Sequence, residues 1–437
     1  MSELFMLDHS CETAKPELEL FSSLPTQSSV EEGYYEDFDS KNNITDGPIT
    51  FEVSGDGTDY MDLLNTYLMC DVKVTKADGS DIENDDNVGC VNGLMHALFN
   101  QVVVKLNDTM VSENNNTYHY RAHLENLLSF GTEAKQNQLS AALWFKDTAG
   151  HMDDIAAANA GNVKRKEYIA ESKTVQLMGR IHSDMFMQNR YLVNGVDLTI
   201  KLNRNNSSFC LMGADVSTFK LKMVSATLFV RKVKVNSSIQ LKQIEKIDKQ
   251  NSPAIYPIRR VEVKSFGIGV GSLSTTKEGL FSGQLPKKIV IGFVESAAYD
   301  GRYSKNPFNF KHFNTKFITL YCEGKQIPVK GFQPDFANSQ SLRSYMSLYE
   351  VAGKLFHDSS LDIDRKEYEN GYSLFGFDLT PDLSETGCFH LIKKGNIKLE
   401  VKFSQQLAQP VNCIIYAEFD SVVKIDKSRE VIVEHFG

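Results

Sequence analysis

The sequence predicts an all-β fold in which two antiparallel sandwiches follow one another along the chain. Two segments about 200 residues apart carry the main evidence: residues 195–202 read GVDLTIKL, and residues 395–403 read GNIKLEVKF. Alternation of apolar and polar side chains is typical of a strand with one buried face. Each segment precedes a polar turn and a long apolar run, at 219–235 and 411–425. Two halves that end in the same way indicate a tandem pair of sandwiches.

The first 46 residues differ in charge from the rest of the chain. They contain eleven Asp or Glu and two Lys or Arg, a net charge of −9, which equals that of all 437 residues. A polar, self-repelling segment cannot bury enough apolar surface to fold alone. We therefore expect residues 1–46 to form an extended acidic arm, and the β body to begin near Pro48. The neutral remainder argues against a duplex-binding surface, which needs a basic face.

Residues 47–236 are expected to form the first sandwich. Alternating apolar residues predict strands at 66–75 and 101–106, and residues 92–99 predict a short helix between them. Residues 117–146 instead space their apolar side chains as a helix does, which predicts one helical insertion in this half.

Residues 237–256 carry mixed charge and a helical pattern, and we interpret them as the connector between the halves. Residues 257–437 then predict the second sandwich, with further strands at 258–266, 287–294, 316–322 and 372–379. The intervening residues 295–314 and 328–371 are long, polar and irregular. Connections of that length in a compact domain are usually functional surface.

The composition predicts a protein of a reducing compartment, the cytosol or the nucleus. The seven cysteines are scattered and form no Cys-X-X-Cys pair, which indicates reduced thiols. No apolar run is long enough to span a bilayer, so we expect no membrane span. The N-terminus lacks the basic and apolar regions of a secretory signal.

Two motifs suggest chemistry only weakly. His119 and His123 are four residues apart on a predicted helix, as two zinc ligands would be, but the protease glutamate and a third ligand are missing. Residues 267–271 read GIGVG and resemble a phosphate loop superficially. The required spacing and the following helix are absent, so the end of a strand is the favoured interpretation.

Four other features have plain interpretations. Residues 78–86 are acidic enough for calcium but depart from the EF-hand spacing, which favours a solvated hairpin. Residues 164–166 read KRK and predict a solvated loop rather than a nuclear address. Asp153-Asp154 alone defines no cleft, and Trp144 is the sole tryptophan. We therefore predict no catalytic, cofactor-binding or metal-binding residues, and no cofactor.

Eight stretches, taken in order with their spacing, resemble the major capsid proteins of Polinton (Maverick) elements and of adintoviruses. The similarity runs from about residue 17 to the end of the chain. The stretches lie at 115–128, 143–154, 193–198, 257–264, 284–293, 305–312, 333–336 and 370–383.

The resemblance implies a double jelly-roll, which is two tandem eight-stranded sandwiches standing upright to a capsid surface. It implies a non-enzymatic subunit that forms a homotrimer, a pseudo-hexagonal capsomer, in the icosahedral capsid of a double-stranded DNA virus or transposable element. Its partners would be neighbouring capsomers and minor penton or cement proteins, within a virion assembled in the host nucleus or cytoplasm. The acidic arm departs from a basic, DNA-holding tail, so direct sequence-specific binding of nucleic acid is not expected.

The rival interpretation is a β-sandwich amidase or carbohydrate-active enzyme, since paired jelly-rolls also occur in enzymes. A cleft with two close carboxylates and stacked aromatic rings would favour that rival. A solid threefold contact surface would favour the capsid subunit.

Overall fold

The first half of the chain forms two four-stranded antiparallel sheets. The computed structural model describes residues 9–434 except 12, 43, 45, 46, 56, 85, 113, 114, 216, 217 and 384–387. The first sheet has the order β1 (Val30–Asp39), β10 (Phe219–Val235), β3 (Tyr60–Lys76) and β7 (Val175–Gly179). The second has the order β2 (Ile49–Val53), β8 (Leu198–Arg204), β5 (Phe99–Leu106) and β6 (Thr109–Met110). The short strands β4 (Val88–Cys90) and β9 (Leu211–Gly213) pair separately.

The second half repeats this arrangement. One sheet runs β11 (Ala254–Ile268), β19 (Val411–Ile425), β14 (Lys288–Glu295), β17 (Leu374–Asp378), with β20 (Val431–Glu434) added to β19. The other runs β12 (Ser274–Lys277), β18 (Lys394–Phe403), β15 (Thr315–Cys322), β16 (Lys325–Phe332), with β13 (Ser282–Gln284) added to β18. The eight main strands of each half therefore correspond position by position, which confirms the predicted double jelly-roll.

The two alternating segments of the sequence occupy equivalent places. β8 and β18 are each the second strand of their sheet, in different sandwiches. Their predicted apolar faces are buried completely, and these side chains are Val196, Leu198, Ile200, Leu202, Ile397, Leu399, Val401 and Phe403. Within the second sandwich, Phe293 of β14 meets Phe403 of β18 edge to face across the core, with ring centroids 6.1 Å apart. The period-two pattern thus marks the core faces correctly.

The predicted helical insertion is present in the first half. It consists of α2 (Tyr118–Ser129), α3 (Thr132–Gln136) and the 3₁₀ turn η2 (Gln138–Ala142), and α4 (Ala160–Ile169) follows. The short helix α1 (Leu94–Ala97) lies where a helix was expected, and α5 (Ser207–Cys210) precedes β9.

The prediction that residues 295–314 and 328–371 are irregular is wrong in part. They contain the helices α7 (Ser296–Tyr299), α8 (Leu342–Val351) and α9 (Arg365–Glu369), the turn η5 (Phe336–Asn338) and most of β16. A capping box in which Asp364 and Glu367 satisfy each other's backbone N–H groups starts α9. α8 packs closely on β17. At Gly376 a Cβ would lie 2.5 Å from the Ser347 carbonyl oxygen, so only glycine permits this approach.

The acidic arm is shorter than predicted, and the β body begins well before Pro48. β1 lies inside residues 1–46 and pairs with β10 from Val30 to Asp39. Its acidic side chains face a basic strand: Glu36 lies 2.5 Å from Lys232, and Glu32 is in register with Lys234. The charge of this segment therefore favours strand pairing, and among the described residues of the predicted arm those before Val30 extend from the body. A 3₁₀ turn, η1 (Pro16–Leu18), lies in that extension.

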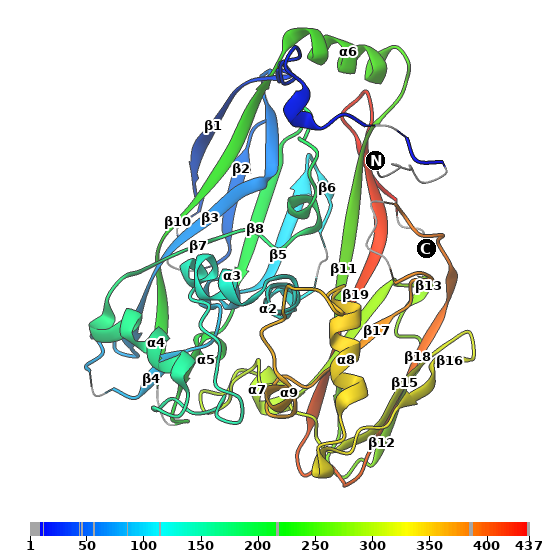
Figure 1. Ribbon diagram of the computed structural model, residues 1–437. Helices are drawn as coiled ribbons and strands as arrows, with labels where there is room; N and C mark the ends of the chain where they lie inside the picture. The colour runs from blue at the N-terminus through cyan, green and yellow to red at the C-terminus, as the bar shows by residue number, and fades with distance from the viewer. Residues whose placement is uncertain are drawn as a thin grey trace, which may run out of the picture.

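The predicted connector contains α6 (Ser237–Asp248), which the Asn236 side chain caps by accepting a hydrogen bond from Ser238 N. Figure 1 shows α6 at the top of the molecule, between the end of β10 and the start of β11. β11 begins at Ala254, inside the range assigned to the connector. Among the described residues, the helices are all too short or too polar to cross a membrane.

Candidate assembly surfaces

A third apolar core joins the two sandwiches. Figure 1 places α2, α7, α8 and α9 in the region where the two halves meet. In this junction the ring of Tyr120, on α2, stacks on Tyr299, with centroids 5.7 Å apart. His123 lies flat against Phe308 at 4.0 Å and also contacts Trp144. Since both sandwiches contribute fully buried aromatic rings, the junction resembles a domain interior and holds the halves as one body.

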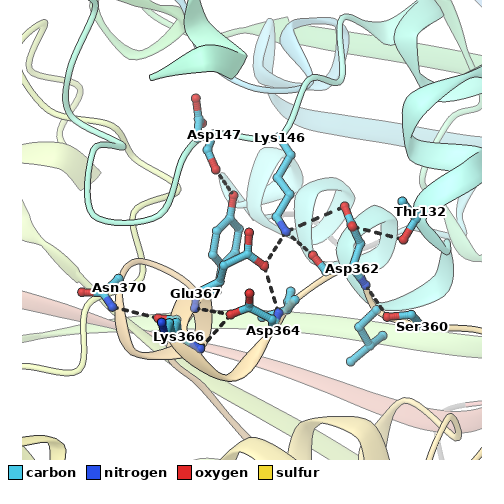
Figure 2. A network of polar contacts seen from close by, with 12 residues as sticks. Thr132, Lys146, Asp147, Ser360, Asp362, Asp364, Lys366, Glu367 and Asn370 are labelled. Atoms are coloured by element: carbon cyan, nitrogen blue, oxygen red, sulfur yellow. Dashed lines mark hydrogen bonds and ion pairs between the residues drawn. The ribbon is translucent and has the colours of Figure 1, made fainter. Parts of the chain in front are cut away.

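A polar network crosses the same junction (Figure 2). Lys146 Nζ lies 2.6 Å from Glu367 Oε2 and also contacts the backbone oxygen of Asp362. The Tyr372 hydroxyl donates to the Asp147 carbonyl oxygen at 2.8 Å. Asp362 is held in turn by Thr132, whose hydroxyl donates to its Oδ1 at 3.1 Å. These contacts connect the end of the insertion to the segment around α9.

The KRK segment is a helical part of this junction, so the predicted solvated loop is wrong. Residues 164–166 lie in α4, and the Arg165 side chain is fully buried. Its guanidinium pairs with Asp147 and donates to the Cys90 carbonyl oxygen at 2.8 Å. Asn306 of the second half donates to the other oxygen of Asp147 at 3.0 Å. Arg165 therefore acts as a structural cation between the halves.

A second buried ion network lies under α2. Arg121 contacts Glu125 at 3.1 Å and Asp184 at 2.6 Å, and Glu125 lies 2.5 Å from His182 Nδ1. Asp184 also accepts a hydrogen bond at 3.3 Å from the Val261 amide of β11, in the second half. Burial alone would raise the pKa of Glu125, but Arg121 and His182 hold it well below its ordinary value. The network is satisfied internally and offers a ligand no free charge.

The two histidines considered as metal ligands are packing residues. Burial lowers the pKa of both His119 and His123 to about 3, so both rings are neutral. His119 packs against Phe209, with centroids 4.2 Å apart. Within the described parts of the chain, His, Cys, Asp and Glu side chains nowhere gather in threes as a metal site requires.

The other sequence motifs are accounted for by local structure. Residues 267–271 lie at the end of β11 and the turn after it, as expected. In the acidic hairpin, Lys73 pairs with Asp81 at 2.9 Å, and Lys76 pairs with Glu83 and Asp86. Asp85 of that hairpin lies outside the described residues. Trp144 is 2% exposed and cannot stack on a sugar.

A hollow of about 440 Å³ brings carboxylates from both halves together. Asp153 and Glu295 line it, with Lys311 between them at 3.1 and 2.5 Å. Lys305 adds a contact to Glu295 at 2.9 Å. Burial alone would raise the pKa of Glu295, but hydrogen bonds from Lys311 and Lys305 bring it below its ordinary value. This environment favours an ionised carboxylate, whereas a glycosidase general acid needs a raised pKa.

Large apolar side chains are exposed in two kinds of place that suit contact with another chain. One is the extension before β1, where Phe21 is 98% exposed. The other is the second half, where Val329 on β16 is 92% exposed and Phe356 in the turns after α8 is 90% exposed. Sequence reasoning predicted functional surface at 295–371 but did not identify these side chains. Single exposed apolar side chains are common on protein surfaces, so the extension, where Leu18, Leu20, Phe21 and Leu24 are exposed close together, is the stronger of the two candidates.

Comparison with known proteins supports the fold assignment. No known protein-family model matches the sequence. The chain is 26% identical over 424 residues to "Uncharacterized protein F54H12.2" of Caenorhabditis elegans, covering 94% of this chain and 99% of that protein. A solved chain of the Sputnik virophage superposes with a TM-score of 0.66 at 13% identity, over 99% of this chain and 94% of that one.

Two solved major capsid proteins have the same architecture. The mavirus major capsid protein gives a TM-score of 0.55 at 10% identity, over 100% of this chain and 97% of that one. The Faustovirus major capsid protein gives 0.53 at 9% identity, over 92% of each chain. At such identities the likeness concerns the fold. The chain is therefore a double jelly-roll protein with the fold found in viral major capsid proteins.

Proposed function

We propose that this chain is the major capsid protein of a Polinton-like double-stranded DNA virus or element. The observation that carries the proposal is the match of two complete jelly-rolls, in tandem, to the mavirus major capsid protein over nearly all of both chains. The resemblance of eight sequence stretches to the Polinton and adintovirus family supports the same assignment from independent evidence.

The proposed mechanism is self-assembly. Three chains carry six jelly-rolls, which gives a homotrimer with pseudo-hexagonal outline that can tile an icosahedral shell. Obligate interfaces of this kind often bury more than roughly 2,000 Å². We assign the exposed side chains of Val329, on β16, and Phe356, in the turns after α8, to contacts between copies. Each sandwich would be a separate domain, with the boundary at the α6 connector.

The proposed partners are neighbouring capsomers and minor penton or cement proteins, in a virion assembled in the host nucleus or cytoplasm. Direct sequence-specific binding of nucleic acid is not part of the proposal. The net charge of −9 is unfavourable for contact with phosphates, and a basic duplex-binding face was not expected from the neutral body.

The enzyme alternative, a β-sandwich amidase or carbohydrate-active enzyme, has less support. Its best location is the hollow at Asp153 and Glu295, where lysines pair with both carboxylates. Hydrolysis of polysaccharide or amide substrates by the purified chain, lost on Glu295→Gln, would establish that alternative.

The test is the native mass of the full-length chain, combined with electron micrographs of the purified material. We expect light scattering to give three times the chain mass of 49.1 kDa, and larger shells under assembly conditions. A stable 49.1 kDa species at micromolar concentration would contradict the proposal. Phe356→Asp should weaken the trimer, whereas Lys220→Asp, on an exposed strand position, should leave it intact.

A further inference from the structure

An open apolar hollow lies beside α6, the helix that Figure 1 shows at the top of the molecule. Its volume is about 470 Å³, and α6, the start of β11, the loop at 189–193 and the junction of β1 with β10 surround it. Apolar side chains dominate its lining, among them Ile239, Ile247 and Ile255. The volume is in the range of sites that bind a peptide segment or a small ligand.

The polar groups inside the hollow are already satisfied by one another. The Tyr60 hydroxyl donates to Gln243 Oε1 at 2.7 Å, and Tyr256 donates to the Tyr191 carbonyl oxygen at 3.2 Å. Arg190 donates to the Ile255 carbonyl oxygen at 2.6 Å. These paired groups leave an occupant mainly apolar surface, with Arg190 and Lys246 as the charged groups of the lining.

The charge of the hollow is positive. Among the described residues that line it, Arg190 and Lys246 carry positive charge and none carries a carboxylate. Lys242 of α6 is exposed nearby in the sequence, whereas Lys249 pairs with Glu245 at 3.1 Å. Asp248 is also exposed on α6, so the positive charge of the lining comes from Arg190 and Lys246. An occupant that combines apolar side chains with carboxylates would match this surface.

The extension before β1 has that composition. Its residues 17–21 read ELELF, and Leu18, Leu20, Phe21 and Leu24 are 70, 75, 98 and 88% exposed. Residues 1–29 as a whole contain five Asp or Glu and one Lys. The chain alone thus presents an unburied apolar acidic segment and an unfilled apolar basic hollow, each suited to the other.

The root of the extension lies at the rim of the hollow. Ser29 and Val30 belong to its lining, and Ser29 is held there by Asn236 N, which donates to its carbonyl oxygen at 2.9 Å. From this point the extension leaves the body, and residues 13–29 are exposed throughout. When extended, the eight residues from Ser29 back to Phe21 reach up to about 27 Å and the twelve back to Glu17 up to about 40 Å, enough to cross to a molecule that adjoins this face. Two copies that adjoin at this face bring each hollow within reach of the other extension.

We propose that residues 17–24 of one copy dock in the hollow of a second copy, with Glu17 and Glu19 directed towards Lys246 and Arg190. This exchange links copies at the end of the molecule that carries α6. It rests on the proposed function, because only an assembling chain holds a second copy at the required distance.

The experiment is disulfide trapping between full-length chains. Cys11 and Cys388 are exposed, so both are first replaced by serine. One chain then carries Phe21→Cys and a differently tagged chain carries Ile255→Cys. After mixing under assembly conditions and mild oxidation, we expect a covalent pair containing both tags. Glu17→Lys with Glu19→Lys should lower its yield at least fivefold, and Lys246→Glu should restore part of that yield.

The matched control replaces Phe356 rather than Phe21, since its side chain is 90% exposed on a loop of the second half. Phe356→Cys should give little product with Ile255→Cys. Equal yields from the two partners, in material that light scattering shows to be assembled, would overturn the docking while leaving the proposed function intact. A further variant carries Phe21→Cys and Ile255→Cys in the same chain. A disulfide that forms only within that chain, and never between two chains, would also overturn the docking between copies. If light scattering shows that the chain stays monomeric, both the proposed function and the docking are wrong.

Discussion

The ammonium group of Lys146 lies 2.6 Å from Glu367 Oε2, and this ion pair joins the first sandwich to the second. Lys146 follows the helical insertion, and Glu367 belongs to α9 (Figure 2). The two side chains are 22% and 28% exposed, so solvent screens the pair only in part. Glu367 also accepts a hydrogen bond from the Asp364 amide at 2.9 Å, which fixes the position of the carboxylate that Lys146 contacts.

Replacing Lys146 with Met should therefore destabilise the chain by about 1–3 kcal/mol, because Glu367 and the Asp362 carbonyl oxygen lose a charged donor. Urea unfolding measures the change. Lys220→Met is the control, since Lys220 is exposed on β10, and we expect a change below about 0.5 kcal/mol. Equal effects of the two substitutions would show that the cross-sandwich pair adds nothing.

Introducing a carboxylate at equivalent core positions should damage both sandwiches. Leu202→Asp in β8 and Leu399→Asp in β18 each place Asp where exposure is 0%, and each should cost about 4 kcal/mol. Thermal melting tests this. Lys201→Asp, on the exposed face of β8, should melt close to the parent. If a leucine variant also melts like the parent, its strand does not face the core.

Two truncations should show that the residues before β1 are dispensable for folding and that β1 itself is required. Deleting residues 1–24 should leave the melting temperature unchanged, because the described residues among them are exposed. Deleting residues 1–45 should lower it sharply, because β1 is lost and the side of β10 is uncovered. A chain that lacks residues 1–45 and melts normally would show that β1 contributes no stability.

Acid should destabilise the junction through its buried histidines. With the pKa of His123 lowered to about 3 by burial, the folded ring stays neutral while the unfolded chain takes up a proton below about pH 6.5. The stabilising contribution is thus complete above pH 6.5 and is lost as pH falls from there towards 3. By pH 4.5 the loss should reach about 2–3 kcal/mol per histidine.

Substituting His123 by Phe should flatten the dependence of melting temperature on pH between 7 and 4.5. Phe suits the site, because His123 stacks on Phe308 and, among the described residues, neither ring nitrogen has a hydrogen-bond partner. His357→Phe, at an exposed position, should leave the pH profile as it is. Identical profiles for all three proteins would contradict the assignment of the acid sensitivity to the buried ring.

The reactivity of each cysteine thiol, measured by titration, should follow its burial. In denaturant without reductant we expect seven free thiols, and in the native chain rapid reaction of the two exposed ones, Cys11 and Cys388. Burial raises the pKa of Cys90 to about 11 and of Cys70 to about 12, so these thiols should react only on unfolding. Recovery of five or fewer in denaturant would reveal a disulfide.

The sequence predicted the strands that carry a clean apolar face and missed those that do not. β8 and β18 could be predicted because every second side chain is apolar, and the structure buries these side chains. β1 was not, because it is an edge strand whose burial pattern has no buried face. It is held by backbone pairing with β10, to which the Glu36–Lys232 ion pair adds, and in the sequence an acidic strand resembles a disordered arm when its basic partner is about 200 residues away.

The junction could be predicted less well than the sandwiches. Arg165 lies in a KRK segment that resembles solvated surface, and only the folded chain brings Asp147 and Asn306 to it. The start of α9 did carry a readable signal, because Asp364 precedes Glu367 at the capping-box spacing. The exposed apolar side chains of the extension were visible in the sequence, but the hollow that suits them arises from four separate segments.

The strand order also governs how the chain can fold on the ribosome. β10 lies between β1 and β3, and β19 lies between β11 and β14, so in each half this central strand is synthesised after both of its neighbours. Until Val235 has left the exit tunnel, β1 and β3 have no common neighbour, and their edges stay open to other nascent chains. Such delayed closure leaves strand edges exposed during synthesis, so chaperone protection during translation should raise the yield of folded chain.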